Sequence, residues 1–85
     1  MGANEQNTQL MHALEAQETL KQRGFTASCG PTGAVVFDRR SHVRGVWHFH
    51  GSSFFWTPAG YAEPTYRTDT LESAVNYVLE VIAQI

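Results

Sequence analysis

The segment that most constrains the fold is VWHFHGSSFFW, residues 46–56, where aromatic side chains alternate with histidine and serine around a Gly-Ser pair. Alternation with a period of two is typical of half-buried strands, and Gly51-Ser52 fits a two-residue turn with glycine at positive φ. This register places four rings on one face of the hairpin: Trp47, Phe49, Phe54 and Trp56. The opposite face carries Val46, His48, His50, Ser53, Phe55 and Thr57. The sequence therefore predicts an aromatic core face and a histidine-bearing outer face.

A second hairpin is predicted for residues 25–38, FTASCGPTGAVVFD. Residues 31–33, Pro-Thr-Gly, suit a three-residue loop in which Gly33 is left-handed, and this loop pairs Cys29 with Val35. The inward face then holds Phe25, Ala27, Cys29, Val35 and Phe37. The other face holds Thr26, Ser28, Val36 and Asp38. A shift of one residue would mix the two sets, so the apolar pattern supports the same register as the turn.

Two helices are predicted, one on each side of the strands. Apolar residues recur at helical spacing over residues 5–23, and Gly24 follows as a C-terminal stop signal. The second helix spans residues 69–84, where Asp69 caps the N-terminus and Glu72 completes a capping box.

These elements define one small α+β domain over residues 1–85, with two layers and the order α-β-β-β-β-α. The strands form an antiparallel meander, and both helices pack on its aromatic face. The connection before the last helix is rich in proline and glycine, with a short edge strand expected at residues 65–67. Residues 1–4 are expected to be disordered. The outer face of the sheet would then meet solvent or a partner.

Composition indicates the cellular environment and the kinds of partner to expect for this protein. A net charge of −2 gives no global field that would attract nucleic acid or an anionic membrane. Cys29 is the one cysteine, and a small domain without a disulfide is typical of a reducing interior. The N-terminus does not resemble a secretory signal, and no apolar stretch reaches the length of a membrane span. We therefore expect a cytoplasmic protein without a membrane partner.

His48 and His50 are the candidates for a metal site, because their i, i+2 spacing projects both imidazoles from one face of a strand. A structural zinc ion needs four ligands, and a catalytic one needs three and a water. His42 and Asp38 could add a ligand, whereas Cys29 belongs to the opposite face. The favoured alternative is that both histidines are half-exposed sheet residues. We accordingly expect no metal and no cofactor.

The segment DRRSHVRG, residues 38–45, gathers three of the six basic residues in a predicted loop. Arg39, Arg40 and Arg44 could contact phosphate or an acidic partner, with His42 adding charge in acid. A solvated polar loop is the favoured interpretation, because the segment has neither a glycine-rich nor a helix N-terminal phosphate cradle. Nucleic-acid binding is disfavoured further because the final helix opens with the acidic TDTLES, whereas double-stranded RNA binders need basic residues there.

The residues needed for nucleophilic catalysis are sparse. Cys29 is expected to point inward, where a cysteine behaves as an inert hydrophobic residue. Ser41 and His42 are neighbours without an acidic residue to orient the imidazole. Glu63 lies in the proline-rich connection, and such connections more often cover the end of a core than form a catalytic pocket. We expect no enzymatic activity.

The favoured function is a small protein-interaction module without catalysis, working as a homodimer or docked on a larger protein. Its contact surface is expected to be either the apolar C-terminal helix or the mixed apolar and polar outer face with the arginine segment. The surface residues expected are Val36, Arg39, Arg40, His42, Arg44, Val46, His48, His50 and Phe55. The alternatives are a nucleic-acid binder led by the three arginines and a metal site at His48 and His50.

Overall fold

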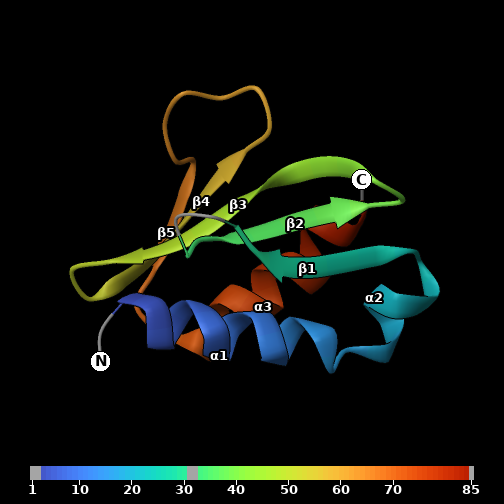
Figure 1. Cartoon of the computed structure of the whole chain (residues 1–85), viewed down its shortest axis with the longest axis horizontal. Coiled ribbons are helices and arrows are strands. Elements are labelled where there is room, and N and C mark those ends of the chain that lie inside the picture. Colours follow the sequence, from blue (N-terminus) through green and yellow to red (C-terminus); the bar gives the residue numbers. More distant parts are fainter. Residues whose placement is uncertain (1–2, 31–32, 85) are drawn as a thin grey trace.

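The computed structural model describes residues 3–30 and 33–84 (Figure 1). The elements are, in chain order, α1 (Ala3–Glu15), α2 (Glu18–Gln22), β1 (Phe25–Cys29), β2 (Val35–Arg39), β3 (His42–His50), β4 (Ser53–Pro58), β5 (Tyr66–Thr68), α3 (Leu71–Glu80) and a closing 3-10 helix, η1 (Ile82–Gln84). Within these residues five strands form one antiparallel meander in the order β1-β2-β3-β4-β5. Both α1 and α3 lie below the strands in Figure 1 and pack on the same face. The predicted α+β two-layer class is therefore confirmed, and β5 is the expected short edge strand.

The β3–β4 hairpin has the predicted register. His50 lies opposite Ser53, so Gly51 and Ser52 form the turn, and Gly51 has a φ of 65°. All four rings of the predicted core face pack with the helices: Trp47, Phe54 and Trp56 are buried, and Phe49 is half-buried at the rim. Cross-strand aromatic pairs of this kind add about 0.2–1 kcal/mol each. This hairpin therefore supplies a large part of the core.

The β1–β2 hairpin also has the predicted register. Cys29 lies opposite Val35, and Ala27 lies opposite Phe37. Gly33 has a φ of 89°, which is the left-handed conformation predicted for it. The other two residues of the predicted loop, 31 and 32, lie outside the described residues.

A buried amide that the sequence analysis did not single out joins α1 to β3. Asn7 is 3% exposed, and its Oδ1 accepts a hydrogen bond of 3.0 Å from the backbone N–H of Phe49. A buried polar side chain is stable in a core when it is hydrogen-bonded in this way. Asn7 therefore fixes the position of α1 against the sheet.

The limits of the helices differ from the prediction at the N-terminus. α1 begins at Ala3, so residues 3 and 4, which were expected to be disordered, are helical, and residues 1 and 2 lie outside the described part of the chain. Within residues 3–30 and 33–84, the structure contains no helix with the length and apolar character that crossing a membrane requires.

The single helix predicted over residues 5–23 is wrong, because the segment forms two helices. α1 ends at Glu15, and Gln17 is extended, with φ −84° and ψ 108°, before α2 begins. In one continuous helix, Leu14 and Leu20 would point roughly 120° apart. The break lets both side chains enter the core, where each is 2% exposed. Packing on the sheet therefore overrides the local helical preference.

The final helix is shorter than predicted and has a different cap. α3 ends at Glu80 and is followed by η1. Thr70, rather than Asp69, is the N-cap, and its Oγ1 accepts a hydrogen bond of 3.1 Å from the N–H of Ser73. Asp69 instead accepts a hydrogen bond of 2.6 Å from the hydroxyl of Ser53 on β4. This contact with the sheet removes Asp69 from the cap.

Candidate binding surfaces

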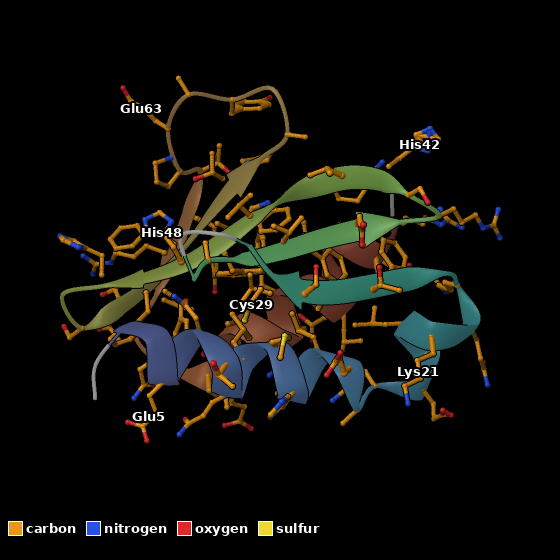
Figure 2. All side chains as sticks on the ribbon, viewed as in Figure 1. Glu5, Lys21, Cys29, His42, His48 and Glu63 are labelled. Carbon is orange, nitrogen blue, oxygen red and sulfur yellow. The ribbon has the colours of Figure 1, made fainter. Side chains whose placement is uncertain are left out.

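The outer face of the sheet carries no helix in the described part of the chain, and its centre is apolar. Val36 lies opposite Val46 across β2 and β3, and His48 lies opposite Phe55 across β3 and β4. All four residues are half-buried although no second layer covers them, because neighbouring side chains in a sheet cover one another. Figure 2 shows the imidazole of His48 on the side of the sheet away from the helices, as predicted.

The His48 imidazole is the central polar group of this face. Its ring stacks on Phe55, with centroids 5.5 Å apart and an angle of 18° between the planes. Burial lowers the pKa of His48, and the nearby His50 lowers it further. A lowered pKa favours the neutral imidazole. Arg67 of β5 lies opposite Phe55, so His48, Phe55 and Arg67 are neighbours across three strands.

His48 and His50 project from the same face, as predicted, but among the described residues no third ligand joins them. No group of three His, Cys, Asp or Glu side chains in that part of the chain could hold a metal ion. His42 lies at the far end of β3, and Asp38 accepts a hydrogen bond from the hydroxyl of Thr26. Because zinc sites use at least three protein ligands, the two histidines of one chain supply an incomplete set.

The arginine segment is not the loop that the sequence predicts. β2 continues to Arg39 and β3 begins at His42, so the turn consists of Arg40 and Ser41. These two residues have φ values of 51° and 73°. Positive φ at both positions is the backbone of a type I′ turn, for which Asn-Gly is the preferred sequence. An Arg-Ser turn carries no such sequence signal, which explains why the hairpin was missed.

A β-bulge at Arg44 follows this turn. The register between β2 and β3 shifts by one residue there, which makes Arg44 the extra residue of β3. Its carbonyl accepts a hydrogen bond of 2.9 Å from the N–H of Ala59. At the next position, Gly45, a Cβ atom would lie 2.6 Å from the ring of Trp56 and from the carbonyl oxygen of Thr57. A bulge redirects the side chain of its extra residue, which here is Arg44.

The turn and the bulge together bring four basic side chains around one pocket. Arg39, Arg40, His42 and Arg44 line a hollow of about 320 Å³ at this end of the sheet, which we call the basic pocket. Among the residues that the structure describes, none of the four forms an ion pair. A protein with a net charge of −2 thus carries a local concentration of uncompensated positive charge.

The predicted contact surface is consequently divided in two. Arg39 lies on the helix-bearing side, where its guanidinium carbon is 5.2 Å from the centroid of the Phe25 ring. The other members separate into the outer face, with Val36, Val46, His48, His50 and Phe55, and the basic pocket, which Arg40, His42 and Arg44 line together with Arg39. The outer face and the basic pocket are therefore separate sites.

Cys29 is more exposed than predicted. It lies opposite Val35 in the predicted register, but β1 is an edge strand, and the thiol at its end remains exposed, 3.5 Å from the sulfur of Met11.

The buried hydroxyl of Ser53 donates to Asp69 instead of to a histidine. A carboxylate that accepts directly from serine does not form the serine–histidine pair of a hydrolase.

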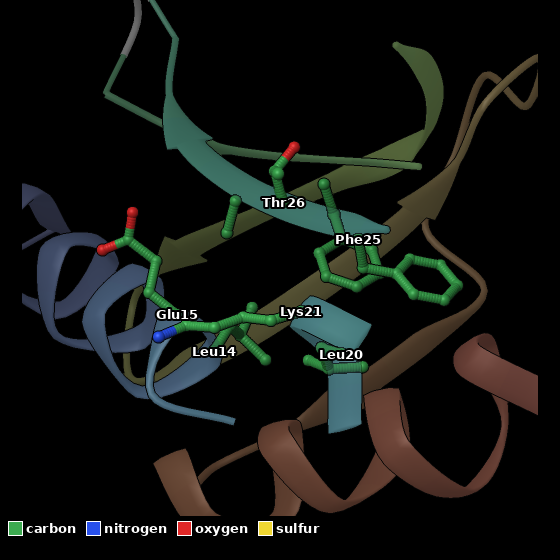
Figure 3. A pocket seen from close by; sticks show the side chains of 8 residues that line it. Leu14, Glu15, Leu20, Lys21, Phe25 and Thr26 are labelled. Atoms are coloured by element: carbon green, nitrogen blue, oxygen red, sulfur yellow. The ribbon is translucent and has the colours of Figure 1, made fainter. Parts of the chain in front are cut away.

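A second hollow opens where α1 ends and α2 begins (Figure 3). It has a volume of about 350 Å³, with a floor of core side chains and a polar rim: Leu14, Leu20, Phe25, Ala27 and Phe37 below, and Glu15, Lys21 and Thr26 above. The hollow lies at the helix break, which was not predicted, so the hollow was not predicted either. Its floor is part of the folded core, and its rim combines both signs of charge.

Three exposed residues beside these sites were not selected from the sequence. Val43 is 51% exposed and lies opposite Asp38, and Tyr61 is 63% exposed in the loop after β4. Arg67 joins the outer face because β5 pairs with β4. The alternation that located Val46 would also have located Val43 if the bulge had been recognised.

Comparisons of the chain with models of protein families, with curated proteins and with solved structures found no significant match.

Proposed function

We propose that the protein is a non-catalytic interaction module that forms a homodimer through the outer face of its sheet. The observation that supports this proposal is an apolar row on an uncovered sheet face, formed by Val36, Val46 and Phe55 and extended by the exposed Val43. Centres of protein interfaces are rich in aromatic residues and poor in lysine and glutamate. The outward positions of the described strands hold neither lysine nor glutamate.

The size of the outer face suits a second copy of the chain. Strands β1 to β4 contain five to nine residues. With β5 at three residues, strands spaced about 4.8 Å apart and roughly 10 to 30 Å long present about 450 Å². A standard interface covers about 800 Å² on each partner, so a dimer would use the whole face and residues around its edge. Two-fold symmetry then places the same residues on both sides, and a small domain benefits most from the added burial.

The C-terminal helix, the other surface expected from the sequence, is less suited to this role. Its apolar residues already pack on the core: Leu71, Ala74, Val75, Val78, Leu79 and Ile82. Among the described residues of this segment, Val81 is the exposed large apolar one, at 42%. One exposed valine does not form an apolar patch.

Sedimentation velocity over a wide range of protein concentration tests the proposal. We expect a reversible dimer in the native protein and a monomer in Phe55→Glu. The new carboxylate lies opposite Arg67, its cross-strand neighbour, so the monomer should remain folded. The dimer dissociation constant should rise at least about 30-fold, because a central aromatic contact contributes about 2 kcal/mol or more.

Val81→Glu is the matched control, since it places the same charge on the exposed surface of the C-terminal segment. Its dissociation constant should equal that of the native protein. A native protein that stays monomeric at every concentration would contradict the proposal. So would a dimer that Val81→Glu dissociates and Phe55→Glu leaves intact.

Nucleic-acid binding by Arg39, Arg40 and Arg44 is the weaker candidate. The basic side chains gather at a single turn, whereas single-strand binders combine a basic groove with several rings for base stacking. Binding that falls steeply with salt and is lost in Arg40→Ala would favour this candidate.

A further inference from the structure

The basic pocket has a chemical character that self-association does not explain. Its lining consists of three guanidinium groups and one imidazole, from Arg39, Arg40, Arg44 and His42. A guanidinium is planar and binds phosphate oxygens two at a time. The volume of about 320 Å³ is roughly ten times the ~30 Å³ of a water molecule, enough for a phosphate and part of the group that carries it.

The fold orders the side chain of Arg39 and the backbone of Arg40. Arg39 Nε donates a hydrogen bond of 3.0 Å to the carbonyl of Arg23, and the guanidinium lies over the ring of Phe25. This bond uses one of five N–H donors and leaves the others available. The backbone N–H of Arg40 donates to the carbonyl of Gly24 at 3.0 Å, and the aliphatic part of the exposed Arg40 side chain lies beside Gly24. Side chains that are already ordered lose less entropy when they bind a ligand.

The backbone of the turn gives a third, independent observation. Arg40 and Ser41 both have positive φ, a conformation that is uncommon for residues other than glycine, asparagine and aspartate. Asn-Gly would form the same turn with less strain. Strained backbone of this kind clusters at ligand sites. An arginine at this position is therefore better explained by a bound anion than by the needs of the hairpin.

From these observations we infer that the basic pocket binds a phosphate monoester, that is, the doubly charged phosphate of a small metabolite or of a phosphorylated side chain. Several guanidinium groups around one hollow match a compact dianion, which can accept bonds from all of them at once. A nucleic-acid backbone would instead need basic residues spread along a path to meet successive phosphodiesters. The described lining of the pocket contains no carboxylate that would compete with the ligand.

NMR titration of the full-length protein tests this inference, with the arginine Nε–Hε signals as the readout at constant ionic strength. The probes are inorganic phosphate, O-phosphoserine, adenosine 5′-monophosphate and an oligothymidylate without terminal phosphates.

We expect the monoesters to bind at least about tenfold more tightly than the oligothymidylate does per phosphate. Arg40→Ala and Arg44→Ala should each weaken monoester binding at least about tenfold, because each removes a charge-assisted hydrogen bond. Preference for O-phosphoserine or for the nucleotide identifies the source of the phosphate.

Three matched variants act as controls. Arg67→Ala removes an exposed arginine on β5, and Ser41→Gly keeps the turn and all four lining side chains. Phe55→Glu acts on the outer face, so it separates this inference from self-association. All three should bind the monoesters as the native protein does. Absent binding, or monoester affinity that neither arginine variant lowers, would overturn the inference. Tighter binding of the oligothymidylate would also overturn it and would identify a nucleic-acid site.

Discussion

His48 shows how its position on the sheet face lowers the pKa of a single side chain. Burial lowers its pKa below the usual 6.5, and His50 lowers it further. The unfolded chain therefore takes up the proton at a higher pH than the folded protein does. The free energy of unfolding should fall as the pH decreases through about 6.5, and should level off once the pH is below the folded pKa.

Replacing His48 with glutamine should flatten this part of the pH profile. Urea denaturation at a series of pH values measures the free energy of unfolding directly. His12→Gln, at an exposed position on α1, is the matched control and should keep the native profile. A His48→Gln variant with the native pH dependence would assign the effect to another group.

Gly45 is a second residue whose role depends on its surroundings. A Cβ atom there would lie 2.6 Å from the ring of Trp56, which is itself 3% exposed and cannot move aside. Gly45→Ala should lower the free energy of unfolding by about 3 kcal/mol through overpacking. Gly51→Ala, where nothing lies within 4 Å of the new Cβ, should cost about 1–2 kcal/mol through its positive φ alone. Equal losses in the two variants, measured by urea denaturation, would exclude the steric explanation.

The β2–β3 hairpin is the element in which local preference and structure disagree most. Ser41 has a φ of 73°, which glycine adopts without steric cost. Ser41→Gly should therefore raise the free energy of unfolding by about 1 kcal/mol. Ser52→Gly in the β3–β4 turn is the control, because Ser52 is not among the positive-φ residues and glycine there should lower stability. Changes of the same sign in the two serine variants would contradict this account.

The hairpins and helices differ in how far the sequence predicted them. Both predicted registers are correct, because glycine turns and side-chain alternation act over a few residues. The helix break and the Thr70 cap were missed, because each depends on a distant contact. Leu20 must reach the core, and Asp69 is engaged by Ser53.

The described part of the chain forms a two-layer structure in which no helix covers one face of the sheet. If that face forms a dimer, folding and association are linked, and the melting temperature should rise with protein concentration. Differential scanning calorimetry over about a hundredfold range of concentration measures this effect. Phe55→Glu should melt at one temperature throughout the range. A native melting temperature that is independent of concentration would argue against a dimer.

The two candidate sites were accessible from the sequence to different degrees. The outer face follows from the period-two pattern, and the side chains predicted there are on it: Val36, Val46, His48, His50 and Phe55. The basic pocket was missed as a pocket, although its residues were selected. A turn of two non-glycine residues and a bulge at Arg44 create it. The turn has no local sequence signal, whereas Gly45 within the strand is a weak signal for the bulge.

The amino-acid sequence by itself determined which side of the β1–β2 and β3–β4 hairpins faces the helices. The turn of each hairpin sets the register, and the alternation of apolar and polar residues then assigns the two faces locally. The tertiary structure alone decided where the first helix breaks, why Cys29 is exposed on an edge strand, and how Arg39, Arg40 and Arg44 come to surround one pocket. Those outcomes depend on contacts between segments far apart in the chain, and such contacts exist only after the layers have packed.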